Sequence, residues 1–92
     1  MNALELLNII GTGETSTVQF KEVLDNSESI AGEMIALSNS KGGMILFGVR
    51  DKTGDIIGLD YSQIQSTGNR VATIANDLIR PQIFIFTEVV SL

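Results

Sequence analysis

The sequence contains no cysteine and no histidine among its 92 residues. Without cysteine the chain forms neither disulfides nor thiolate metal sites. Without histidine, zinc sites built on imidazole and acid–base chemistry centred on imidazole are excluded as well. Any catalysis by this chain must therefore use carboxylates, lysine, hydroxyls or a hard metal ion held by oxygen ligands.

Long apolar runs are also missing. No stretch approaches the roughly 20 residues that a membrane-spanning helix needs, and the first ten residues, MNALELLNII, lack the basic start of a secretory signal. These features predict a cytoplasmic protein with no membrane partner. The length fits one domain near the small end of those that fold alone, and a hydrophobic content of 43% is enough for a core.

Basic residues are few, with six Lys and Arg against eleven Asp and Glu, for a net charge of −5. This balance argues against unspecific binding of nucleic acid, which depends on Lys and Arg that neutralise phosphates. The basic residues are nevertheless unevenly placed, because Lys41, Arg50 and Lys52 flank a single predicted strand. A local basic patch on an acidic domain is therefore one expectation.

Hydrophobic periodicity predicts an α+β fold, in which about three helices pack on a mixed β-sheet in the order α-β-α-β-β-α-β. Helices are expected at residues 3–10, 25–40 and 61–79, and strands at residues 17–23, 43–49, 55–60 and 82–90. Residues 51–54 (DKTG) are typical of a hairpin loop, with Gly54 in the left-handed position. Phe47, on an apolar central strand, and Leu78, on the last helix, are predicted to be buried.

The last predicted strand has no partner after it in the sequence. This predicts a sheet that is incomplete at its C-terminal end, and a chain that is the N-terminal fragment of a longer protein. An open strand of this kind also favours a homo-oligomer in which the strand pairs with another chain.

Two blocks of sequence together resemble the signature blocks of the Schlafen-type AlbA-like domain. They are residues 13–22 (GETSTVQFKE) and residues 37–60 (LSNSKGGMILFGVRDKTGDIIGLD). The resemblance covers about residues 5–90, so residues 1–92 are taken as a single AlbA-like domain. The residues that fall on the family pattern, in order, are Glu14, Phe20, Lys21, Asn39, Gly42, Gly43, Gly48, Val49, Asp51, Gly54 and Gly58.

The resemblance implies association with nucleic acid, either DNA or RNA. Bacterial members are commonly described as DNA-binding domains at the N-terminus of transcriptional regulators, often followed by ATPase-like and winged-helix regions. In vertebrate Schlafens the related domain carries a metal-dependent RNase site of two Glu and one Asp. Matched residue by residue, these fall on Glu14, Gln19 and Asp51. An amide is a poor ligand for Mg²⁺ or Mn²⁺ compared with a carboxylate, so Gln19 weakens the nuclease hypothesis.

The adjacent glycines Gly42 and Gly43 follow a predicted helix end. The simpler interpretation is a left-handed helix stop and a tight entry into the next strand. The alternative is a bare backbone that contacts a phosphate or a base. A helix C-terminus carries the negative end of the dipole, so this is not an anion cradle of the P-loop type. The predicted nucleic-acid-binding residues are Lys41, Gly42, Gly43, Arg50 and Lys52.

The polar residues Glu14, Lys21 and Asp51 are the candidates for any catalysis, and Glu14 and Asp51 are the candidate ligands for Mg²⁺ or Mn²⁺. Each also has a purely local explanation, as a cap, a solvated strand residue or a turn residue. Three functions follow. The first is a DNA-binding module of a bacterial transcriptional regulator. The alternatives are a divalent-metal-dependent endoribonuclease with a degenerate site, or a structural or oligomerisation module.

Overall fold

The centre of the fold is a β-α-β unit. The computed structural model describes all 92 residues, and in it strand β1 (Val18–Lys21) pairs in parallel with strand β2 (Met44–Phe47), in the register Val18↔Met44 to Lys21↔Phe47. Helix α2 (Ser27–Asn39) is the crossover between them, as a parallel pair requires. Asn26 begins this helix, because its side chain accepts a hydrogen bond from the backbone N–H of Ser29 at 2.9 Å.

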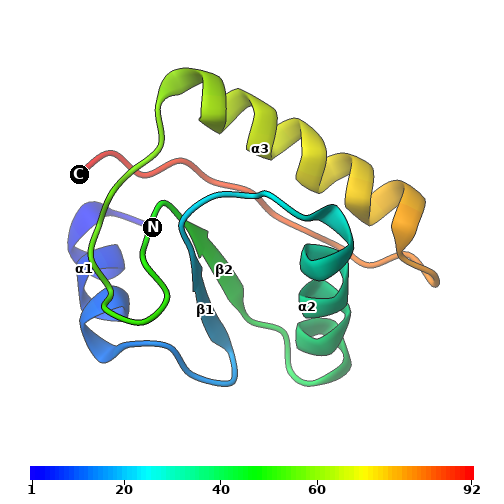
Figure 1. Ribbon diagram of the computed structural model, residues 1–92. Coiled ribbons are helices and arrows are strands. Elements are labelled where there is room, and N and C mark those ends of the chain that lie inside the picture. The colour runs from blue at the N-terminus through cyan, green and yellow to red at the C-terminus, as the bar shows by residue number, and fades with distance from the viewer.

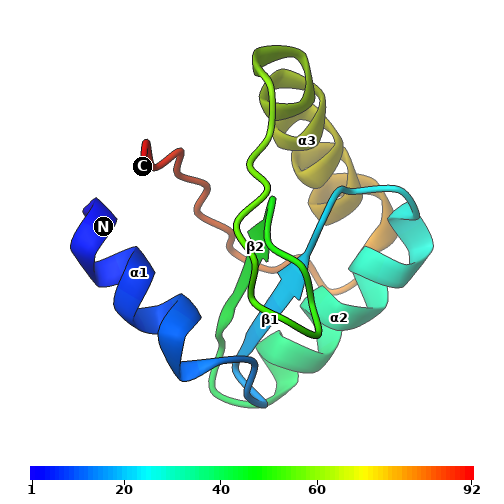
Figure 2. The ribbon, with the colours of Figure 1, turned by 60° about the vertical axis from the view of Figure 1, so that its left-hand side comes forward.

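Two further helices complete the α+β fold. Helix α1 (Ala3–Thr12) lies on the opposite side of the strands from α2, as Figure 2 shows. Helix α3 (Tyr61–Thr73) continues into η1 (Ile74–Leu78), a short π-helical segment, and lies across the top of the molecule in Figure 1. Asn2 and Asp60 each begin their helix with a reciprocal capping box, completed by Glu5 and Gln63. No helix in the structure combines the length and the apolar character needed to cross a bilayer.

The core consists of two clusters, one on each side of the strands. On the side of α1, Phe20 is 1% exposed and packs with Ile10 and Val49. On the side of α2, residues of α2, α3 and η1 and of the segments next to α2 and η1 form the larger cluster, against which Ile45 and Phe47 are packed. Because successive side chains of a strand alternate between its faces, β2 contributes to both clusters. The buried residues of the larger cluster are Leu24, Ile30, Ala31, Met34, Val71, Ile74, Ala75 and Ile79.

The predicted strand at 55–60 is wrong. The DKTG turn forms, and Gly54 has the expected positive φ of 73°, but only Val49 and Ile56 form an antiparallel bridge. The N–H groups of Ile57 and Gly58 then both donate to the carbonyl of Gly48. This shared acceptor stops the regular alternation of ladder hydrogen bonds, so the pairing ends after one bridge.

The predicted strand at 82–90 is also wrong, since these residues pair with no other strand. The sheet therefore has two parallel strands and is not mixed. The C-terminal segment instead runs beneath α3 in Figure 1 and returns toward the N-terminus, where the ammonium of Met1 contacts the carboxylate of Glu88 at 2.6 Å.

Two predictions of burial also fail. Phe47 is only half-buried, because its strand is one of two and not a central strand. Leu78 is 50% exposed, and Ile79 is buried in its place. The π-helical turn of η1 accounts for this exchange, since a wider turn rotates the following residues relative to an α-helix.

Candidate functional site

A polar group lies on the side of β1 that faces α2. Gln19 and Lys21 occupy alternate positions of the strand and therefore share this face. Both contact Glu33 of α2. The ammonium of Lys21 is 2.7 Å from Glu33 Oε1. With the Gln19 amide oriented so that its nitrogen faces the carboxylate, this nitrogen donates to Oε1 and Oε2 at 3.2 and 3.3 Å. A single glutamate is thus held by one lysine and one amide.

The surroundings of Lys21 are strongly acidic. Its pKa is raised above the ordinary value of 10.5, chiefly by the hydrogen bond with Glu33, while partial desolvation opposes the rise. The negative charges of Glu33, Asp51 and Glu14 raise the pKa further. The charges of the predicted residues Glu14 and Asp51 therefore act on the Lys21 ammonium, and Glu33 is its direct partner.

Glu14 has a local structural role. Its Oε1 accepts a hydrogen bond from the backbone N–H of Phe20 at 2.7 Å, which fixes the loop before β1 against the strand. Asp51 is exposed in the turn that follows β2. No group of three acidic side chains lies close enough together to hold a metal ion. Both predicted ligands act on the Lys21 ammonium, and Glu14 already accepts a backbone hydrogen bond, so these residues do not fit a bound Mg²⁺ or Mn²⁺.

The basic residues predicted to bind nucleic acid do not form one patch. Lys41 precedes β2, whereas Arg50 and Lys52 follow it, so they lie at opposite ends of the strand. Arg50 is also paired, with its Nε 3.2 Å from Glu22 Oε1. Four of the six basic residues of the chain bind acidic side chains, backbone carbonyls or a hydroxyl within the fold. The ammonium groups of Lys41 and Lys52 have no such partner.

Gly42 and Gly43 each have a structural role in the backbone. Gly42 has a φ of 81° and donates its N–H to the carbonyl of Leu37 at 2.9 Å, so it ends α2 as predicted. Gly43 lies directly against the start of β1. A Cβ atom at Gly43 would be only 2.3 Å from the carbonyl oxygen of Thr17 and 2.8 Å from Leu37 Cδ2. Close approach of two backbones explains the second glycine.

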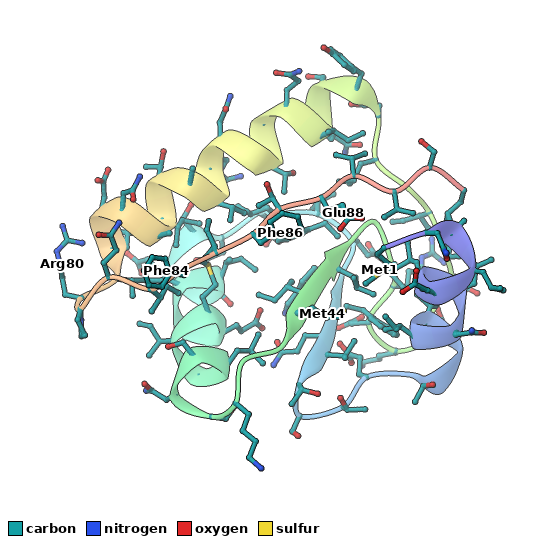
Figure 3. All side chains as sticks on the ribbon, turned by 180° about the vertical axis from the view of Figure 1, so that it is seen from behind. Met1, Met44, Arg80, Phe84, Phe86 and Glu88 are labelled. Atoms are coloured by element: carbon teal, nitrogen blue, oxygen red, sulfur yellow. The ribbon has the colours of Figure 1, made fainter.

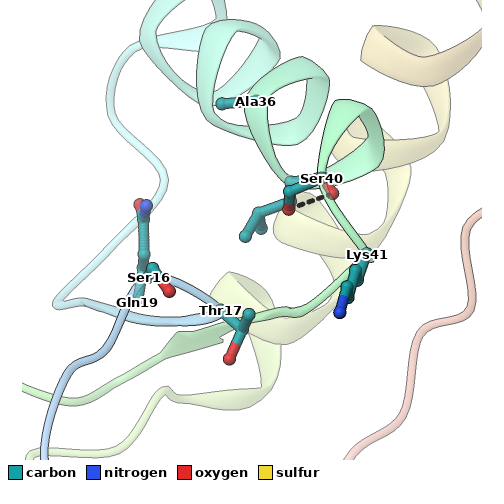
Figure 4. A pocket seen from close by; sticks show the side chains of 7 residues that line it. Ser16, Thr17, Gln19, Ala36, Ser40 and Lys41 are labelled. Atoms are coloured by element: carbon teal, nitrogen blue, oxygen red, sulfur yellow. Dashed lines mark hydrogen bonds between the residues drawn. The ribbon is translucent and has the colours of Figure 1, made fainter.

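A cleft of about 320 Å³ lies between the loop before β1 and the end of α2 (Figure 4). One side of the cleft is formed by the loop before β1 and by β1 itself. The other side is formed by the last turns of α2 and by Lys41 just after the helix. The Ser40 hydroxyl donates to the carbonyl of Leu37 at 3.0 Å, which covers part of the negative end of the helix. The lining residues are Ser16, Thr17, Gln19, Ala36, Leu37, Ser40 and Lys41.

The comparison with protein families agrees with the two sequence blocks. The family model described as "Schlafen, AlbA_2" matches residues 14–92, which is most of the chain. The chain belongs to the Schlafen AlbA_2 family. Its match to this family begins at Glu14 and includes every residue of the cleft and of the polar group around Lys21.

One curated relative is an uncharacterized ATP-binding protein of Ureaplasma parvum serovar 3. It is 36% identical over 73 residues, covering 76% of this chain and 21% of that protein. The AlbA_2 chain therefore spans about a fifth of the length of the relative. No solved structure matches the chain.

Within this AlbA_2 domain, sequence reasoning missed two features. Glu33 lies next to Met34 and three residues after Ile30, at the flank of the buried stripe of α2. A charged residue beside the buried face of a helix indicates that an oppositely charged or polar side chain lies on the strand that the helix packs against. The second missed feature is the place of Ser16 and Thr17 in the lining of the cleft. The cleft forms only where the loop before β1 meets the end of α2, which the local sequence does not show.

Proposed function

We propose that this AlbA_2 chain is a nucleic-acid-binding module of a bacterial transcriptional regulator, and that it holds the sugar–phosphate backbone in the cleft beside Lys41. The observation that carries the proposal is the free ammonium of Lys41 at the edge of a cleft lined with hydroxyls. Lysine ammonium groups and Ser or Thr hydroxyls are common donors to phosphate oxygens. Membership of the family supports the same function.

The electrostatics of the cleft favour a phosphate over a cation. The acidic group nearest to Gln19 is Glu33, and its charge is opposed by the Lys21 ammonium at 2.7 Å. The amide of Gln19 faces the same carboxylate and, with its nitrogen toward the Glu33 oxygens, donates to them. With Glu33 neutralised, Lys41 is the dominant charge among the lining residues.

The size of the cleft limits what it can hold. At about 320 Å³ it lies at the low end of small-molecule sites, which span roughly 300–1,000 Å³. One phosphate and part of its sugar match this volume better than a stacked base, because the lining contains no aromatic side chain. The cleft is therefore suited to position a backbone, and it offers little for reading a sequence.

The printed name of the Ureaplasma relative refers to ATP binding. The relative is far longer than the matched region, and the present sequence contains no G-x-x-x-x-G-K-[ST] run with which a P-loop cradles phosphates.

The proposal is tested by fluorescence anisotropy with short labelled single-stranded DNA, single-stranded RNA and duplex DNA at low salt. Lys41→Ala should weaken binding of each ligand several-fold, because it removes the one free charge in the cleft. Lys52→Ala is the matched control, since Lys52 is the other unpaired lysine and lies at the far end of β2. Equal losses in the two variants, or no binding by the unmodified chain, would contradict the proposal.

A further inference from the structure

The carbonyl of Leu37, in the last turn of α2, accepts three hydrogen bonds. The N–H of Ser40 donates to it at 3.2 Å, and the N–H of Gly42 donates to it at 2.9 Å. The Ser40 hydroxyl is the third donor, at 3.0 Å, and the dashed line in Figure 4 marks this bond. Lys41 lies between Ser40 and Gly42 in the chain. All three donors therefore belong to the neighbours of Lys41, and they hold the turn that carries it against one acceptor.

The backbone that follows Lys41 is anchored to β1. The N–H of Met44, which is labelled in Figure 3, donates to the carbonyl of Thr17 at 2.8 Å. Gly43 lies against the same carbonyl, since a Cβ atom at Gly43 would be 2.3 Å from its oxygen. Thr17 also lines the cleft. Lys41 is thus held between the end of α2 on one side and the opposite side of the cleft on the other.

Among these anchors, the Ser40 hydroxyl is the one contribution from a side chain. The other donors are backbone N–H groups, which every residue except proline supplies. Ser38, also in the last turn of α2, is exposed, and its hydroxyl has no hydrogen-bond partner within the fold. The hold on Lys41 therefore depends on which residue occupies position 40.

The place of Lys41 matters because the cleft lies at the unfavourable end of a helix for an anion. The C-terminus of α2 carries the negative end of the helix dipole, and Lys41 supplies the one positive charge among the lining residues. A mobile turn would have to become ordered when a ligand binds, and this loss of freedom lowers affinity. A turn that is already fixed in the free chain avoids this loss.

We propose that Ser40 is the positioning residue of the cleft, because its hydroxyl, through the Leu37 carbonyl, holds the backbone of Lys41 in place before nucleic acid binds. The effect on binding rests on the function proposed above, whereas the effect on the turn concerns the free chain alone. Ser40 acts through Lys41 and not as a donor to phosphate. A hydroxyl has a single proton to donate, and that of Ser40 is given to the Leu37 carbonyl.

Relaxation of ¹⁵N nuclei in the free chain tests the effect on the turn. Ser40→Ala should lower the order parameters of the Lys41 and Gly42 amides from the value of about 0.85 that is typical of a rigid backbone. Ser40→Thr keeps the hydroxyl and should keep both amides rigid. Ser38→Ala is the matched control and should change neither. Rigid amides in Ser40→Ala, or an equal loss of order in Ser40→Thr, would overturn the proposal.

Fluorescence anisotropy with labelled single-stranded DNA at low salt tests the effect on binding. Ser40→Ala should weaken binding about two- to tenfold, the range for one intramolecular hydrogen bond, and should have no further effect when Lys41 is already alanine. An equal loss with and without the Lys41 side chain would overturn the proposal, because Ser40 would then act independently of Lys41. Absence of binding by the unmodified chain would instead contradict the proposed function, and relaxation would still confirm or refute the hold of Ser40 on Lys41.

Discussion

Gln19 determines the chemistry available around Lys21. The resemblance to nuclease members implies a glutamate at this position, and here the amide of Gln19 donates to Glu33 at 3.2 and 3.3 Å. A carboxylate at this position would lie beside the carboxylate of Glu33, and the pair would outnumber the single ammonium of Lys21. A glutamate at position 19 would therefore make this surface more attractive to cations than the glutamine does.

Gln19→Glu should raise the affinity for Mn²⁺, because it adds a carboxylate beside Glu33. Isothermal titration with Mn²⁺ measures this directly, and Gln65→Glu on the exposed surface of α3 is the control. The unmodified chain should not cleave RNA at an appreciable rate, even with Mn²⁺, because Gln19 supplies no ligand charge. Robust cleavage that is abolished by Asp51→Asn would show that this assignment is wrong.

Lys21 should make stability depend on alkaline pH. Its pKa in the folded chain is raised above 10.5 by the hydrogen bond with Glu33, so the folded state holds this proton more tightly than the unfolded state does. The stabilisation is complete below about pH 10.5 and is lost as pH rises through the folded pKa. The melting temperature should therefore fall less over this alkaline range in Lys21→Met than in Lys52→Met. Identical pH profiles would contradict this.

At the scale of single residues, the sequence blocks predicted that Glu14 and Asp51 would lie near Lys21, and their charges do raise its pKa. Residue type alone did not reveal which partner Lys21 takes. Glu33 is far from Lys21 in sequence, and the β1–α2 packing that joins them depends on tertiary structure. The pairing of Arg50 with Glu22 likewise depends on tertiary structure, because Arg50 follows β2 and Glu22 follows β1.

Among the elements, the β1–β2 pair depends on the space at Gly43. Gly43→Ala should cost about 3 kcal/mol, because the new Cβ would meet the Thr17 carbonyl at 2.3 Å and force two backbones apart. Gly32→Ala is the control: nothing lies within 4 Å of a Cβ there, and alanine should stabilise α2 by about 0.5–1 kcal/mol. Urea unfolding measures both. A neutral Gly43→Ala would mean that β1 and β2 are spaced more widely than the structure shows.

The side of the sheet that packs on α1 depends on Phe20. Phe20 is 1% exposed, so Phe20→Ala should cost about 3–5 kcal/mol, a large part of the 5–15 kcal/mol typical of a domain. Phe47→Ala is the comparison, and it should cost less because Phe47 is half-buried. An equal loss in the two variants, measured by urea unfolding, would contradict this ranking.

The three helices were predictable because their signals are local. Asn26 and the pairs Asn2–Glu5 and Asp60–Gln63 cap the helix starts within one turn. Strand β1 was predictable from its alternating apolar and polar residues, and β2 from its continuous apolar run. The segments at 55–60 and 82–90 also contain β-branched and apolar residues, but a strand needs a partner edge as well. Gly48 ends one pairing and nothing pairs with the other segment, and neither fact is contained in the local sequence.

For the whole molecule, the net charge of −5 and the pairing of four basic residues limit any affinity for nucleic acid. Each phosphate contact contributes about −0.7 to −0.9 to the slope of log K against log salt. With only Lys41 and Lys52 unpaired, the slope should be no steeper than about −2. Affinity should then fall roughly tenfold between 50 and 200 mM salt, and not by the factor of about 10³–10⁵ seen with many contacts.

Charge reversal tests this limit in the same binding assay. Reversing Lys41, Arg50 and Lys52 together should abolish binding. Lys41→Glu alone should reduce the slope by about one, whereas Arg50→Ala should change it little, because the Arg50 guanidinium is already 3.2 Å from Glu22. A slope of about −4 or steeper in the unmodified chain would mean that Lys21, Arg50 or Arg70 leaves its partner to bind phosphate. The structure would then describe a state that nucleic acid rearranges, and the cleft at Lys41 would be only one part of a larger contact surface.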